Sequence, residues 1–177
     1  RVLGTAAMTA VFATSAFAQN STLRWQDDME SYPVGLQLTQ APPNNSNPIT
    51  NGGWDGWDGD PTVLGDVVAN PSGPGQVLEI QPTDDHLFHF GNNFASNGGH
   101  DTTKGTWVFT IDVYFPSTTT GLSYYIIQNT YNHMGPYNWS VQIGMDAAQQ
   151  IISADYGGGG CASAPLPLDR WFTFKTE

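Results

Sequence analysis

Two tryptophans and three aspartates are interleaved in residues 54–60, Trp-Asp-Gly-Trp-Asp-Gly-Asp, and their chemistry suggests a binding site. An indole face stacks on the C–H groups of a sugar ring, and a neighbouring carboxylate orients hydroxyl groups or a cation. We therefore predict four ligand-binding residues here: Trp54, Asp55, Trp57 and Asp58. The alternative is structural, with one tryptophan closing the open end of the fold and the aspartates forming Asx-turns.

A second group of rings and amides lies in residues 129–139, Asn-Thr-Tyr-Asn-His-Met-Gly-Pro-Tyr-Asn-Trp. This stretch predicts a hairpin end, where rings and amides converge and the amides both donate and accept hydrogen bonds. We add Tyr131, Tyr137 and Asn138 to the predicted site. Trp139 belongs to the apolar alternation of the following strand, so we expect it in the core, with Tyr137 on the same side nearer the rim. The alternative is that all these rings serve core or turn packing.

Acidic residues are also grouped at Asp27, Asp28 and Glu30, where their oxygens suit a hard cation such as Ca²⁺. Residues 55–60 offer a similar set, and neither matches the loop pattern of an EF-hand. An acidic cluster is more often a solvated face. We predict no cofactor, with a structural calcium ion at Asp27, Asp28 and Glu30 as the open alternative.

Strands must position these groups, because apolar residues recur at every second position over residues 107–115 and 139–145. Residues 123–130 are apolar on both faces, so we expect a central strand covered on both sides, in an antiparallel meander with the other two. Further strands are predicted at residues 23–25, 63–68, 76–80, 84–90, 151–156 and 171–175, with a nearly continuous loop over 39–62 and a turn at 165–168. The prediction is an all-β protein, an antiparallel β-sandwich of the jelly-roll type.

The net charge of the chain limits the classes of partner that it can bind. The chain of 177 residues carries 5 Lys and Arg against 16 Asp and Glu, a net charge of −11. So few cations exclude a phosphate-binding surface, and we predict no nucleic-acid partner. Cys161 is the single cysteine, so no disulfide forms within the chain.

The first 18 residues have the features of a secretory signal peptide: Arg1, a small-apolar stretch, and Ala-Phe-Ala at 16–18 as the cleavage site. They are too short and too rich in Ala and Thr to span a membrane, which takes ~20 strongly apolar residues. We predict one domain over residues 19–177, truncated at its C-terminus, and secretion to the extracellular space or cell surface.

The chain resembles the concanavalin A-like lectin and glucanase superfamily, the laminin-G-like jelly rolls, and within it a set of secreted bacterial proteins without a settled activity. The stretches that carry this resemblance are DDMESYPVG at 27–35, GGWDGWD at 52–58, GTWVFTIDVYFPS at 105–117, NTYNHMGPYNWSVQIG at 129–144, ADYGGG at 154–159 and DRWFTFKTE at 169–177. The resemblance implies a jelly roll, a fold that carries lectins, hydrolases and lyases.

Catalytic residues of such enzymes are not evident. Retaining glucanases of this fold carry E-x-D-x-x-E on one strand, and none of Glu30, Glu79 and Glu177 begins that motif. Asp84 and Asp85 are adjacent, so they face opposite sides of a strand. Catalysis is left open, and we expect a non-catalytic carbohydrate-binding or cell-surface module with a glycan partner. The alternatives are a polysaccharide-active hydrolase or lyase with divergent catalytic residues, and a purely structural extracellular domain.

Overall fold

The computed structural model describes residues 26–37, 54–60, 62–63, 65–88, 106–131, 134–154 and 162–177. Over these residues the protein is all-β, and its only helical element is the short 3₁₀ turn η2 at Trp57–Gly59. The strands are β1 Trp54–Gly56, β2 Asp66–Ala69, β3 Gln76–Glu79, β4 His86–Phe88, β5 Phe109–Tyr114, β6 Leu122–Tyr131, β7 Tyr137–Asp146, β8 Ile151–Ala154, β9 Ser163–Pro165 and β10 Trp171–Thr176.

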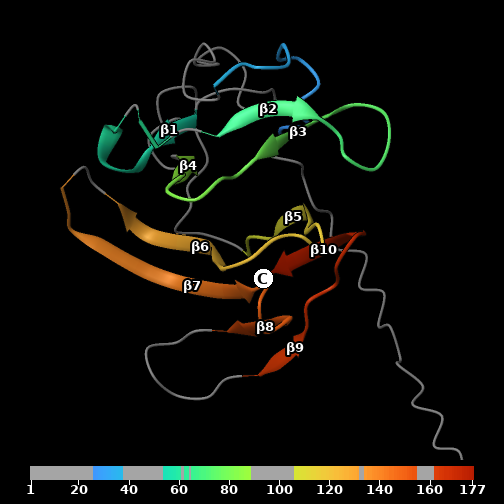
Figure 1. Cartoon of the computed structure of the whole chain (residues 1–177). Coiled ribbons are helices and arrows are strands. Elements are labelled where there is room, and N and C mark those ends of the chain that lie inside the picture. Colours follow the sequence, from blue (N-terminus) through green and yellow to red (C-terminus); the bar gives the residue numbers. More distant parts are fainter. Residues whose placement is uncertain are drawn as a thin grey trace, which may run out of the picture.

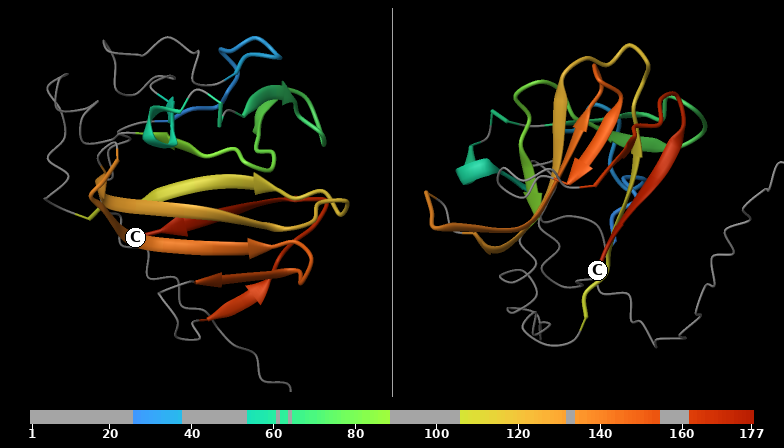
Figure 2. Two further views of the ribbon diagram at one scale, coloured as in Figure 1. Left: turned by 60° about the vertical axis from the view of Figure 1, so that its left-hand side comes forward. Right: turned by 90° about the horizontal axis from the view of Figure 1, so that it is seen from below.

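Every strand pair is antiparallel. The largest sheet has the order β6-β7-β8-β9, a meander in which each strand pairs with the next along the chain. Three smaller pairs accompany it, β5 with β10, β2 with β3, and β1 with β4. Figure 1 shows β1 with β4 and β2 with β3 on one side of the long β6–β7 hairpin, and Figure 2 shows the same arrangement from two further directions.

The main core lies where the β5–β10 pair packs on one face of the four-stranded sheet. Its buried residues are Phe115, Met145, Ala147 and Leu166. Tyr125 of β6 stacks on Phe174 of β10, with ring centres 6.4 Å apart and planes at 10°. Because these rings come from different sheets, the contact joins two layers, and apolar burial between layers is the principal stabilising term of a β-sandwich. The predicted all-β, antiparallel sandwich class is therefore confirmed.

A second, smaller core lies under the β2–β3 hairpin. Val67 is fully buried there with Tyr32, and the half-buried Met29, Leu36, Trp54 and Leu78 pack around them. The segment 27–37 is held against β2 by backbone bonds, Gly35 N–H to Val67 O at 2.7 Å and Val67 N–H to Leu36 O at 2.9 Å. This core fixes the position of β1, from which the turn η2 follows directly.

The predicted pairing of the three long strands was wrong for the first of them. β5 pairs with β10 over its whole length, and the meander instead continues from β7 into β8 and β9. β6 was also predicted to be central and covered on both faces. Among the described strands it forms the edge of its sheet, and its outward Tyr124 is 47% exposed. The reason is that periodicity identifies a strand and its faces but carries no information on which strand lies beside it.

Several local features of the structure also differ from the prediction. The predicted loop over 39–62 contains β1 and η2 in its described part, and the predicted turn at 165–168 is preceded by β9. Ile111, predicted to be buried, is 39% exposed, because the main core takes in Val113 and Phe115 of this segment but does not reach Ile111. The predicted signal peptide, the strand at 23–25 and Cys161 lie outside the described residues. None of the described segments forms an apolar helix long enough to cross a membrane.

Candidate ligand-binding site

The two predicted groups of rings meet in space. Tyr131 and Tyr137 are partners across the end of the β6–β7 hairpin, and η2 brings Trp57 against both of them. The ring centre of Trp57 lies 4.8 Å from that of Tyr137 and 5.1 Å from that of Tyr131, and the two tyrosines are 5.7 Å apart. Such separations and tilted planes are favourable for aromatic pairs. We call Trp57, Tyr131 and Tyr137 the aromatic cluster.

Asp58 fastens the turn η2 to the hairpin. Its Oδ1 accepts the backbone N–H of Met134 at 2.7 Å, and the Tyr137 hydroxyl donates to both carboxylate oxygens at 2.8 Å. The Asp58 N–H in turn donates to the Tyr131 hydroxyl at 2.7 Å. Asp58 adopts a left-handed conformation, φ 53°, which aspartate tolerates better than most residues. One residue thus makes contact with both strands of the hairpin.

The phenol of Tyr137 keeps its proton across the physiological range. Burial among the rings, followed by the hydrogen bond to Asp58 and its negative charge, raises the pKa of Tyr137 to about 12. A raised pKa means that the folded state favours the protonated phenol. The hydrogen bond to Asp58 is therefore fully present below the ordinary tyrosine pKa of about 10 and is lost as the pH rises through about 12.

Trp139 of β7 is not a core residue, contrary to the prediction. It lies two residues beyond Tyr137 in the same strand and is 52% exposed. The pairing of β6 with β7 is irregular here, with register shifts between Ile127 and Gln128 and between Gln128 and Thr130, so strict alternation does not continue from the main core to Trp139. In addition, β8 pairs only with the last four residues of β7, Ile143 to Asp146. The indole of Trp139, which periodicity placed in the core, is therefore exposed to solvent.

The remaining predicted ligand-binding residues are placed elsewhere. Trp54 packs on the second core, with its Nε1–H donating to Asp27 Oδ2 at 2.8 Å and its ring edge-on to Phe88. Asn138 is exposed and follows Tyr137 directly, so it points to the opposite face of β7 from the aromatic cluster. Asp55 pairs through its backbone with Leu87, and its side chain lies outside the described part of the structure.

The three predicted calcium ligands all accept hydrogen bonds from the protein. Asp27 accepts from Met29 N–H at 3.0 Å, from the Tyr32 hydroxyl at 2.6 Å, and from Trp54. Asp28 accepts from the N–H of Glu30 at 3.1 Å. Glu30 accepts from the N–H of Gln76 at 3.0 Å, which ties this segment to the start of β3. Among the described residues no three His, Cys, Asp or Glu side chains gather as a metal site, and the calcium ion stays a prediction.

Sequence reasoning found the members of the aromatic cluster but missed the residues that connect them. Met134 contributes a backbone N–H, which no side-chain pattern reveals. Glycines flank the turn at Gly56 and Gly59, and they are the one local signal that residues 57–58 fold sharply.

No protein-family model, curated protein or solved structure matches this chain. The resemblance to the concanavalin A-like superfamily therefore stays a prediction, and the site is interpreted from its own geometry.

Proposed function

We propose that this protein is an exported, non-catalytic module that binds carbohydrate, and that its binding surface is the aromatic cluster together with Trp139. The proposal is carried by two features at the end of the β6–β7 hairpin: the mutually packed rings of the aromatic cluster, held in place by Asp58, and Trp139, which lies two positions from Tyr137 in β7 and is more than half exposed. Open indoles on a rigid support are what stacking on a sugar ring requires.

Rigidity supports this proposal. The rings of Trp57, Tyr131 and Tyr137 restrain one another, and Asp58 holds both strands, so little side-chain freedom remains to be lost on binding. A surface that is ordered before its ligand arrives binds more tightly, because the entropy of ordering has already been lost during folding.

Charge indicates the class of glycan. In the described part of the chain the lysine and arginine residues are Arg170 and Lys175, which follow the aromatic cluster in sequence. Lys175 forms an ion pair with Glu177, its Nζ lying 3.3 Å from Glu177 Oε2. With Asp58 beside the rings and a net charge of −11, a uronate or sulfated chain is repelled. We therefore propose a neutral polysaccharide. The antiparallel β-sandwich is compatible with the concanavalin A-like family proposed from the sequence.

The test is retention on neutral polysaccharides, measured by affinity electrophoresis or pull-down with the mature protein. Trp139→Ala is expected to weaken binding about tenfold to a hundredfold, the usual effect of removing an aromatic side chain that becomes buried in a complex. Because Trp139 is exposed in the free protein, the substitution should leave the fold intact. Trp171→Ala is the matched control, since Trp171 is 38% exposed on β10 and is not part of the proposed surface. Equal retention of Trp139→Ala and the parent protein would refute the proposed surface.

One observation favours the hydrolase alternative. Desolvation of the Asp85 carboxyl group, and after it the negative charge of Asp58, raises the pKa of Asp85 above the usual aspartate value. A carboxyl group whose pKa is raised beside a second carboxylate is an arrangement used for general acid catalysis. Release of reducing ends from the bound polysaccharide, abolished by Asp85→Asn, would establish this alternative in place of simple binding.

A further inference from the structure

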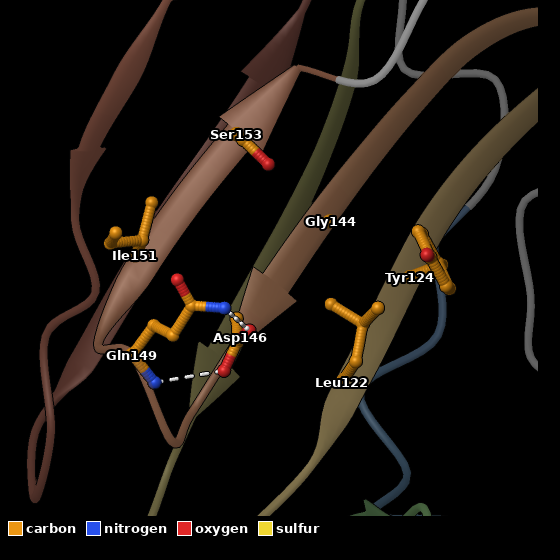
Figure 3. A pocket seen from close by; sticks show the side chains of 7 residues that line it. All are labelled: Leu122, Tyr124, Gly144, Asp146, Gln149, Ile151 and Ser153. Atoms are coloured by element: carbon orange, nitrogen blue, oxygen red, sulfur yellow. Dashed lines mark hydrogen bonds between the residues drawn. The ribbon is translucent and has the colours of Figure 1, made fainter. Parts of the chain in front are cut away.

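A hollow of about 250 Å³ lies on the other face of the four-stranded sheet, away from the main core. Two rows of partners across three strands line it. The first is Tyr124, Gly144 and Ser153, and the second is Leu122, Asp146 and Ile151. Figure 3 shows their side chains around the hollow, with Gln149 from the β7–β8 turn at one end.

The floor of this hollow exists because residue 144 has no side chain. A Cβ at Gly144 would meet Ser153 Oγ and Tyr124 Cε1 at 3.5 Å and Leu122 Cδ1 at 3.7 Å, so a methyl group would fit in ordinary contact and occupy the space. Gly144 is not among the glycines with positive φ, so its backbone does not require glycine. Glycine inside a strand is less stabilising than alanine, and it often marks a bulge, a bend or a place where a ligand or another backbone approaches closely.

The walls of the hollow are apolar and open to solvent. Tyr124 is 47% exposed, Leu122 52% and Ile151 38%. Together they expose one aromatic ring and two branched aliphatic side chains around Gly144, which is itself buried between its neighbours. An exposed phenol ring offers a face for the C–H groups of a sugar.

Polar groups are fixed at one end. Asp146 accepts from the backbone N–H of Gln149 at 2.8 Å and from its side-chain Nε2 at 2.7 Å. Both side chains are therefore oriented, and Figure 3 shows the amide oxygen of Gln149 directed away from Asp146. Ser153 adds a hydroxyl group on the opposite wall. A carboxylate, an amide oxygen and a hydroxyl suit a ligand that donates several hydrogen bonds.

Size and charge define the ligand further. The volume lies below the ~300–1,000 Å³ of pockets for drug-sized molecules, which corresponds to one ring with its substituents rather than an extended chain. Among the residues that the structure describes, neither arginine nor lysine lines the hollow, and Asp146 disfavours an anion.

We propose that this hollow is a second carbohydrate subsite, which takes a single neutral hexose ring stacked on Tyr124 over Gly144. The ring fills the space that a side chain at position 144 would occupy, and its hydroxyl groups donate to Asp146 and Gln149. This subsite rests on the proposed function, because it adds a terminal-sugar position to a protein already proposed to bind neutral polysaccharide at the aromatic cluster and Trp139.

The test uses methyl glycosides of neutral hexoses as probes and the amide NMR spectrum of the full chain as the measurement. We expect saturable shifts at residues of β6, β7 and β8 around Gly144. Gly144→Ala is expected to weaken this binding about tenfold or more, the effect of one added methyl group in a fitted site. The thermal midpoint should be unchanged or higher, since the methyl group meets no atom closer than 3.5 Å.

Gly73→Ala is the matched control, because Gly73 lies in the β2–β3 turn with one atom near its added Cβ, at 3.9 Å. It should bind the probes as the parent does. Equal binding by Gly144→Ala, or no shift with any neutral hexoside, would overturn the subsite even where a polysaccharide is retained through Trp139. Failure of the parent protein to be retained on any neutral polysaccharide, with hexoside binding intact, would instead overturn the aromatic surface. Shifts with a quaternary ammonium probe alone would overturn the class of ligand.

Discussion

At the scale of single residues, Asp58 holds the parts of the candidate site together through hydrogen bonds. Its carboxylate receives a phenol and a backbone N–H from the β6–β7 hairpin, and its own N–H returns a bond to Tyr131. Hydrogen bonds to a charged group are roughly twice as strong as neutral ones. Trp57 precedes Asp58 in the same turn, so the position of the indole depends on these bonds.

Tyr137→Phe removes the phenol that donates to both oxygens of Asp58 and leaves the ring in place. We expect the thermal midpoint to fall by about 2–4 °C, the usual effect of losing one such bond in a chain of this length, and polysaccharide binding to weaken with it. Tyr114→Phe, in β5 and outside both proposed carbohydrate sites, is the control for removing a phenolic oxygen. A variant as stable as the parent would show that Asp58 does not hold the turn through Tyr137.

At the scale of elements, three strands converge on one histidine. Gly65, just before β2, donates its N–H to Nε2 of His86, the first residue of β4. A Cβ at Gly65 would meet the backbone oxygen of Glu79 in β3 at 2.5 Å, so only glycine permits this approach. Nε2 accepts a hydrogen bond only in neutral imidazole. Burial lowers the pKa of His86, and the charge of Asp84 opposes that shift in part.

Stability should therefore fall on mild acidification. With a folded pKa below the unfolded value of about 6.5, the contribution of His86 is fully present above pH 6.5 and is lost as the pH falls below it. We expect the thermal midpoint of the parent to decline between about pH 7.5 and 5 more steeply than that of His86→Gln, whose amide oxygen accepts without titrating. Because the other acids titrate in both proteins, their contribution cancels. Equal slopes would contradict the assignment.

Sequence periodicity predicted the long strands well and their neighbours poorly. The part of β7 at residues 139–145 was recognised from the alternation of Val141, Ile143 and Met145, and Met145 is buried as expected. The same alternation misplaced Trp139, since the register shifts between β6 and β7 interrupt it. Trp57, Asp58, Tyr131 and Tyr137 were identified from residue type alone, and their convergence required the packing of β1 on the second core.

At the scale of the whole molecule, the dominant property is the net charge of −11. A structural calcium ion at Asp27, Asp28 and Glu30 remains a proposal. An ion that binds only the native state raises its stability, so its expected signature is a higher thermal midpoint in millimolar calcium than in EDTA. Asp28→Asn should reduce that difference by removing one ligand charge. Identical midpoints in calcium and EDTA would contradict the proposal.

The bond between Asp58 and Tyr137 joins positions 79 residues apart in sequence. Contacts of such long range form late, because the intervening chain must lose its freedom before the contact can stabilise anything. We therefore expect the surface around Trp57 to form only when η2 packs on the β6–β7 hairpin, and to be absent from partly folded states. Recovery of glycan retention during refolding would accordingly report completion of the native state, later than the burial of Tyr125 against Phe174.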